Sequence, residues 1–154
     1  MVKKMIITTD GSPAAEKAAA FGLDHAAQLG CKVLCITVLR PIEAIIGMKL
    51  EYIFVEEDDS MAKELLSAGE KAVARIVEMG KQKGVEISGK VVRNERVEKG
   101  IIDAARQEGA DLIVIGMHGH GFTGLASPEM GSVTRRLIKL IPPCPVMVVP
   151  PSEG

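Results

Sequence analysis

The stretch "DLIVIGMHGHGFTGLASPEMGSVTRR", residues 111–136, joins an apolar run to a glycine-rich loop and then to the start of a helix. The apolar run predicts a strand that is covered on both faces. Five glycines lie between residues 116 and 132. Because glycine loses the most conformational freedom on ordering, they indicate positive φ angles or a close approach of the backbone to another group. Gly131 and Ser132 begin the next helix, where unpaired N–H groups and a partial positive charge suit a phosphate.

Elsewhere in the chain, short apolar runs alternate with segments of helical period. Such alternation is typical of a parallel sheet with right-handed crossovers and helices on both faces. The sequence therefore predicts a doubly wound α/β fold, with one domain over residues 1–154 and no internal repeat. The predicted strands are 3–9, 32–39, 85–92, 111–116 and 146–149, and the predicted helices are 13–30, 60–83, 97–109 and 132–141.

Local signals predict the ends and the buried faces of the helices. Ser12 is a candidate cap for the first helix, Pro13 suits its first turn and Gly30 suits its end. Gly89 weakens the third strand, and residues 40–60 show no clean period, which indicates a long connection. The positions predicted to face inward are Ala15, Ala18, Ala19, Gly22, Leu23, Ala26 and Leu29 in the first helix, 62, 65, 66, 69, 72, 73, 76 and 79 in the second, and Val133, Leu137, Leu140 and Ile141 in the last.

Composition excludes several classes of protein. The chain is 47% hydrophobic with a net charge of −1, so it carries no overall electrostatic footprint for nucleic acid. No apolar stretch reaches the length of a membrane span, and no signal peptide is evident. The three cysteines, Cys31, Cys35 and Cys144, are odd in number and argue against a disulfide framework, which favours a reducing cytoplasm.

In such a sheet, ligands bind beyond the carboxyl ends of the strands, where the strand order reverses. The first strand delivers Asp10 to this edge and the fourth delivers Gly116. The glycine loop lacks the Gly-Lys-Ser/Thr of a Walker A motif, and it follows the fourth strand rather than the first, which excludes the dinucleotide fingerprint. Asp10 has an alternative role as a cap of the first helix. His118 and His120 suggest a metal pair, although two loop histidines are more often solvated.

Four segments resemble, in order, the universal stress proteins of the class that binds ATP: "IITTDGS", "ITV", "ADLIVIGMHG" and "GSVTRRLIKLIPPCPVMVVP". The nucleotide signature of that family is Gly, two residues, Gly, nine residues, and Gly with Ser or Thr. Gly116 and Gly119 meet the first spacing, but eleven residues separate Gly119 from Gly131, whereas nine separate Gly121 from Gly131. A two-residue insertion around "HGHG" accounts for the difference and leaves either Gly119 or Gly121 as the glycine nearest the phosphates.

The resemblance implies a Rossmann-like nucleotide-binding fold with a sheet in the order 3-2-1-4-5, and a homodimer joined along residues 146–149. It implies ATP between the first and fourth strands, with Mg²⁺ held mainly by the phosphates, and a regulatory or sensor role in the stress response. Asp10 would contact the nucleoside, the Val38 backbone the adenine edge, and Gly116 would lie near the ribose. The residues implied to face the phosphates are Gly119 or Gly121, Gly131, Ser132 and the Val133 backbone.

Two other function classes stay open. One is a slow ATPase or a nucleotidyl-transferring enzyme of the same architecture, for which the loop histidines are the only support. Arg135 is the one basic residue of the last helix near enough to its start to assist at a triphosphate. The other is a structural dimerisation module without a nucleotide, which the insertion favours and the Gly-Ser helix start opposes. Neither the stress signal nor a client protein can be read from the sequence.

Overall fold

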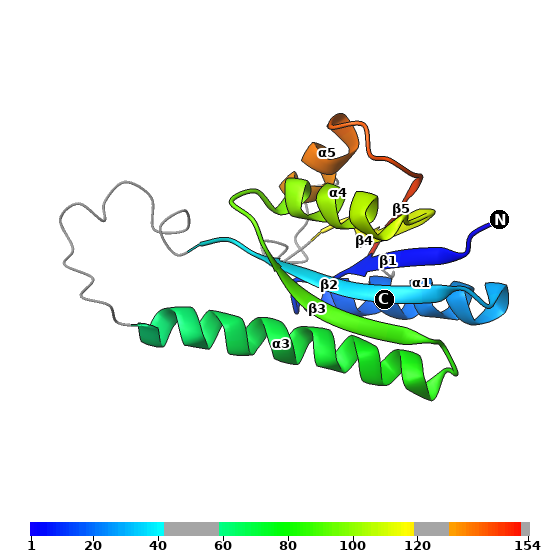
Figure 1. The fold of residues 1–154 in the computed structure, drawn as a ribbon, viewed down its shortest axis with the longest axis horizontal. Helices are drawn as coiled ribbons and strands as arrows, with labels where there is room; N and C mark the ends of the chain where they lie inside the picture. Colours follow the sequence, from blue (N-terminus) through cyan, green and yellow to red (C-terminus); the bar gives the residue numbers. More distant parts are fainter. Residues whose placement is uncertain (42–58, 119–129, 152–154) are drawn as a thin grey trace.

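The computed structural model describes residues 1–41, 59–118 and 130–151. Five parallel strands form one sheet in the order β3-β2-β1-β4-β5, which confirms the predicted fold and strand order (Figure 1). The strands are β1 (Lys4–Thr8), β2 (Lys32–Leu39), β3 (Ile87–Arg93), β4 (Leu112–Gly116) and β5 (Val146–Val149), and the helices are α1 (Pro13–Leu29), α3 (Asp59–Gln82), α4 (Val97–Glu108) and α5 (Ser132–Lys139).

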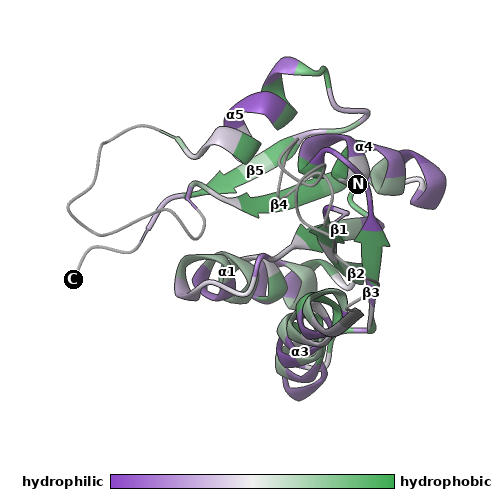
Figure 2. Ribbon diagram, turned by 90° about the vertical axis from the view of Figure 1, so that its left-hand side faces the viewer, coloured by the Kyte–Doolittle hydropathy of each residue, from purple (hydrophilic) through white to green (hydrophobic). Residues whose placement is uncertain are grey.

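Helices cover both faces of the sheet. α1 and α3 pack on one face, where Leu23 and Ile76 join the side chains that β1, β2 and β4 direct to that side. α4 and α5 pack on the other, where Ile101 and Leu137 join the alternate strand residues. Figure 2 shows the hydrophobic strands lying between these two pairs of helices. The strands are therefore buried on both faces, as their near-continuous apolar sequences predict.

The first helix forms as its local signals predict. The Ser12 hydroxyl accepts a hydrogen bond from the Ala15 N–H at 3.1 Å, and Gly30 ends the helix with a φ of 65°. Its inward face is confirmed except at Leu29, which is 49% exposed because it lies beyond Ala26, the last buried residue of the helix. Small residues let the helix lie close to the sheet, since a Cβ on Gly22 would be 3.0 Å from a Val114 methyl carbon.

Gly89 has a packing role that its composition alone does not reveal. A Cβ at this position would lie 2.2 Å from Val73 Cγ1 and 2.8 Å from Val77 Cγ2, both on α3. The absence of a side chain therefore allows α3 to cross the strand closely, a role that adds to the predicted weakening of β3, which stays a prediction. The first turns of α3 extend past the sheet (Figure 1), so Ala62, predicted to face inward, is exposed.

The last helix is shorter than the helical period suggests. It ends at Lys139, so the 3.6-residue spacing no longer applies at Leu140 and Ile141, which are 41% and 82% exposed instead of buried. Ile141 has a φ of 54°, a left-handed conformation that is a genuine outlier for a β-branched residue. Thr134 is buried in the helix instead.

Two further predictions concern the whole chain. None of the helices described is both long and apolar enough to cross a membrane. All three cysteines are free thiols, and burial raises the pKa of Cys35 to about 12.

The irregular connection expected over residues 40–60 lies almost wholly outside the described residues.

Candidate functional site

The turn after β1 is built from side-chain hydrogen bonds. The Asp10 carboxylate accepts from the Ser12 N–H at 2.9 Å, and the Thr9 hydroxyl oxygen accepts from the Gly11 N–H at 3.1 Å. Gly11 has a φ of 81°, a conformation that side chains rarely adopt. Ser12 caps α1 through Ala15, so the alternative in which Asp10 is the cap is wrong. Asp10 is exposed at the carboxyl edge of the sheet.

The end of β2 presents backbone groups to the same edge. On the β1 side of β2, the Ile36 carbonyl accepts a hydrogen bond from the Thr9 N–H. On the β3 side, the Leu39 carbonyl accepts one from the Asn94 N–H. Because backbone groups of successive strand residues point to alternate neighbours, the Val38 N–H and C=O point toward β1. β1 has already ended at Thr8, and no described residue pairs with these two groups there.

The end of β4 is tied directly to the start of α5. Met117 N–H donates to the Val149 carbonyl at 2.8 Å, and Gly131 N–H donates to the Met117 carbonyl at 2.7 Å. The Thr134 hydroxyl, inside the first turn of α5, donates to the Gly116 carbonyl at 2.8 Å and is buried. The bonds of Gly131 and Thr134 hold the helix N-terminus beside the carboxyl end of β4, and the bond from Met117 to Val149 ties that end of β4 to β5.

This N-terminus has features that suit an anion. Gly131 is the N-cap and has no side chain with which to cap the helix, and no acidic residue lies in its first turn. The first N–H groups of a helix have no partner within it, and they carry a partial positive charge. Ser132 is exposed and Val133 is half-buried at this point. Arg135 adds an exposed positive charge one turn along.

Gly116 lies where the backbone of β4 passes close to α1. A Cβ there would be 3.3 Å from the His118 carbonyl oxygen and 3.5 Å from Ala18 Cβ. A side chain would therefore narrow the space between β4 and α1 at the carboxyl edge.

The structure brings six of the predicted site residues to one edge of the sheet, at the ends of β1, β2 and β4 and the start of α5. Gly119 and Gly121, like His120, lie outside the described residues. The contacts expected of each residue with a nucleotide remain predictions. The six residues are Asp10, Val38, Gly116, Gly131, Ser132 and Val133.

Sequence reasoning missed two polar residues near this edge. Thr134 holds α5 to β4, and Glu98 in the first turn of α4 is buried. In both cases a polar residue occupies a helix position whose 3.6-residue spacing predicts an apolar side chain. That mismatch in the sequence could have identified both residues.

The charged groups with shifted pKa values lie at the opposite, amino edge of the sheet. A hydrogen bond from Lys4 at 2.5 Å lowers the pKa of Glu108, with help from Lys90. The backbone N–H groups of Lys3 and Lys4 lower the pKa of Asp111. These contacts join α4 and β4 to β1, so they are structural.

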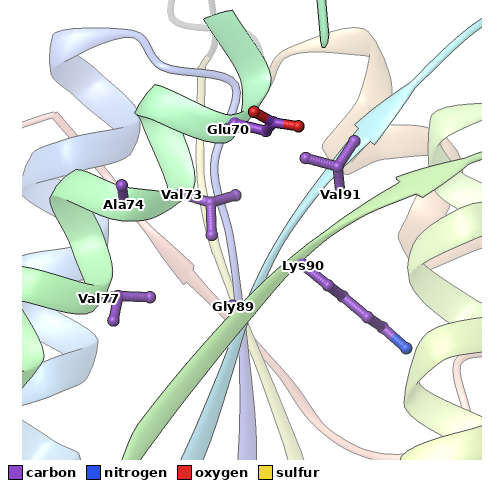
Figure 3. A pocket seen from close by; sticks show the side chains of 7 residues that line it. All are labelled: Glu70, Val73, Ala74, Val77, Gly89, Lys90 and Val91. Carbon is purple, nitrogen blue, oxygen red and sulfur yellow. The ribbon is translucent and has the colours of Figure 1, made fainter. Parts of the chain in front are cut away.

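A groove also lies away from this edge, between α3 and β3 (Figure 3). Its volume is about 300 Å³, and it contains none of the predicted site residues. In Figure 3, Glu70 and Lys90 point to different sides of the ribbon, so no polar cluster forms in it. The residues that line it are Glu70, Val73, Ala74, Val77, Gly89, Lys90 and Val91.

Known proteins resemble this chain over nearly its whole length. A universal stress protein of Methanocaldococcus jannaschii, MJ0531, is 30% identical over 149 residues, which cover 97% of this chain and 82% of that protein. A universal stress protein of Thermus aquaticus is 31% identical over 149 residues, or 97% of this chain and 99% of that one. The solved structure of the hypothetical protein MJ0577 has a TM-score of 0.74 at 27% identity, with 100% of this chain and 99% of that chain covered.

More distant structures of the same fold contain adenine nucleotides. A universal stress protein in complex with cAMP has 21% identity and a TM-score of 0.69, over 98% of this chain and 99% of the other. One from Archaeoglobus fulgidus in complex with dAMP has 23% identity and a TM-score of 0.60, over 97% and 98%. The family model described as the universal stress protein family matches residues 1–150. The chain belongs to the universal stress protein family.

Proposed function

We propose that this protein binds an adenine nucleotide at the carboxyl edge of its sheet, between β1 and β4. The observation that carries the proposal is the N-terminus of α5, where the N-cap is a glycine, the first turn has no acidic residue, and hydrogen bonds fix the helix beside β4. Family members in complex with cAMP and dAMP support the choice of an adenine nucleotide.

Each described residue has a proposed part in the site. The phosphates bind the N–H groups and hydroxyl at Ser132 and Val133, and Arg135 adds positive charge. Asp10 contacts the nucleoside, and the adenine edge meets the N–H and C=O of Val38. Gly116 leaves room for the ribose. We propose ATP as the ligand because this N-terminus suits the negative charge of a polyphosphate.

Magnesium enters this proposal through the phosphates. In the described part of the chain, no three His, Cys, Asp or Glu side chains gather into a metal site. Mg²⁺ prefers phosphate oxygens and retained waters to an all-protein cage, so the ion would depend on ATP and would not bind the protein alone.

Calorimetry tests this function. ATP with Mg²⁺ is titrated into the wild-type protein and into Gly131→Val. The φ of Gly131 is −59°, which any residue adopts, so the variant should fold, but its branched side chain would cover the helix N–H groups. We expect binding by the wild type and none by the variant, with unchanged circular dichroism. Equal binding by both proteins would place the phosphates elsewhere.

We propose that the protein reports nucleotide occupancy as a regulator in the stress response rather than consuming ATP. Hydrolysis needs a positioned water and charge stabilisation at the γ-phosphate, and a misplacement of about 1 Å can cost on the order of a hundredfold in rate. A single-turnover assay with radiolabelled ATP, beside His118→Ala/His120→Ala, decides between the roles. We expect ATP to survive for many minutes. A hydrolysis rate of about one per second, which is within the range of typical enzymes, would establish an ATPase if the double variant lost it.

A homodimer through β5 is the proposed assembly. All four residues of β5 are half-exposed, and within the described sheet the strand pairs only with β4. An unprotected apolar edge invites pairing with another chain, and a two-fold arrangement would extend both sheets. Ile138, Leu140 and Ile141 add exposed apolar surface nearby. Ile141→Asp, at a side chain that is 82% exposed and so contributes little to the core, should shift the protein toward monomer in sedimentation. An unchanged dimer would place the interface elsewhere.

We expect this regulator in the cytoplasm, since its three cysteines are free thiols.

A further inference from the structure

The side chain of Thr134 makes a buried hydrogen bond to a residue outside its own helix. Thr134 is the third residue of α5 and is 3% exposed, and its hydroxyl donates to the Gly116 carbonyl of β4 at 2.8 Å. A threonine hydroxyl inside a helix commonly bonds a carbonyl three or four residues earlier in the same helix. Here the acceptor lies 18 residues earlier in the chain, so the bond is a tertiary contact that joins the helix to the sheet.

The Gly116 carbonyl lies on the side of β4 that faces the candidate site. The Met117 N–H donates to the Val149 carbonyl of β5. Because backbone groups of successive strand residues point to alternate neighbours, those of Gly116 point the other way, toward β1. The register of β4 with β1 ends at Val114. The carbonyl therefore lies beyond the paired part of the two strands, at the carboxyl edge, where the Thr134 hydroxyl is its donor.

Thr134 also belongs to the helix N-terminus to which the phosphates are proposed to bind. The first hydrogen bond of α5 runs from the Arg135 N–H to the Gly131 carbonyl at 3.1 Å. The N–H groups of Ser132, Val133 and Thr134 precede this bond, so they have no partner within the helix. One residue thus has a backbone N–H at the proposed phosphate end and a side chain fixed to β4.

Two buried side chains fix α5 on the sheet. The helix has eight residues, all of them described, and among these only Thr134 and Leu137 are buried. A helix of this length is not stable without such packing. Leu137 holds the second half of the helix in the core that it shares with β4. The direction of the first turn, with its free N–H groups, therefore depends on Thr134 and on the bond from the Gly131 N–H to Met117.

We propose that Thr134 is a positioning residue for the nucleotide, because its hydroxyl sets the N-terminus of α5 at a fixed separation from β1 and β2. The inference rests on the proposed nucleotide site. In that site one ligand meets the backbone of Val38 with its base and the N–H groups near Ser132 with its phosphates. Both ends can bind at full strength only where these two parts are already correctly spaced, and preorganisation of this kind lowers the cost of binding.

Calorimetric titration of ATP with Mg²⁺ tests this role in the wild type and in three variants. Thr134→Val has a similar shape but no hydroxyl, whereas Thr134→Ser keeps the hydroxyl. Ile113→Val is the control, because it removes one buried carbon from β4 in the core that includes Leu137 and no hydrogen-bonding group. We expect Thr134→Val to bind ATP about 10- to 150-fold more weakly than the wild type, as for the loss of one hydrogen bond to a charged group. The other two variants should bind within about threefold of the wild type, since they keep that bond.

Thermal unfolding without ligand separates positioning from a purely structural role. Thr134→Val leaves a buried carbonyl without its donor, and Ile113→Val leaves a small cavity, so both should unfold at a lower temperature than the wild type. If Thr134 only stabilised the fold, the two variants would bind ATP equally well once folded. Thr134→Ala also lacks the hydroxyl, and it takes the place of the valine variant if circular dichroism shows that valine prevents folding.

Three results would overturn the inference. The first is wild-type affinity for ATP in Thr134→Val, the second is an equal loss of affinity in Thr134→Ser, and the third is an equal loss in Ile113→Val. All three leave the nucleotide site standing, whereas a wild type that binds no ATP removes the proposed function itself.

Discussion

Replacing Ser132 with aspartate should change stability and nucleotide binding in opposite directions. The first turn of α5 has no acidic residue and no side-chain cap, so a carboxylate there would interact favourably with the helix dipole, by about 0.3–1 kcal/mol. For a domain of this size that raises the unfolding temperature by about 1–4 °C. The same charge would stand where the phosphates are proposed to bind and would repel them.

Thermal unfolding with and without ATP measures both effects. Ligand at 100 times its Kd adds about 2.7 kcal/mol to a protein that binds it only when folded, which corresponds to a rise of roughly 5–11 °C in the wild type. Ser132→Asp should start higher and show no rise with ATP. Ser132→Asn has nearly the same shape without the charge, and it should keep most of the rise. An equal rise in the aspartate variant and the wild type would refute the placement of the phosphates at α5.

Three other substitutions test features of the fold. Ile141→Gly should raise the free energy of unfolding of the monomer by about 1 kcal/mol in chemical denaturation, because glycine adopts a positive φ without strain; a loss of stability would contradict the strain. Gly89→Ala should lower it by about 1–3 kcal/mol, since the added Cβ meets a Val73 methyl group, and no change would mean that α3 moves freely. Glu108→Gln should lower stability at pH 7 by at most about 1 kcal/mol. The hydrogen bond from Lys4 lowers the pKa of Glu108 in the folded state, so this contribution exists above the pKa of the unfolded chain and is lost as the pH falls through the folded value. The two proteins should therefore become equally stable in acid, and a difference that persists at low pH would exclude the ion pair as its source.

The parts of the fold that were predictable are those that local sequence determines. Ser12 and Gly30 act through backbone groups a few residues away, so their capping roles can be read from the sequence. The run 111–116 predicts a buried strand because every one of its side chains from 112 to 115 is aliphatic. The strand order required the family resemblance, because parallel strands are joined through helices and local pattern does not fix which strands are neighbours.

The errors arise where tertiary contacts override local pattern. The packing role of Gly89 was missed, because the closeness of α3 that excludes a side chain there is a tertiary contact. Leu140 continues the helical period of the sequence, but the helix stops one residue earlier. In the candidate site, the sequence placed Asp10 at the correct edge of the sheet. Whether Asp10 caps α1 or stabilises the turn before it depended on the direction of the Ser12 hydroxyl, which the sequence does not give. Thr134 could not be anticipated, because its partner is a carbonyl on another element.

The hydrogen bond between Met117 and Gly131 bears on how long the loop that it closes can be. Thirteen residues lie between these two positions, whereas the spacing of the family signature given above would leave eleven. For ends already held together, the longer closure costs only about 0.15 kcal/mol more in chain entropy. Chain entropy therefore places little restriction on the number of residues between these two positions, as long as the hydrogen bond that joins Met117 to Gly131 is kept.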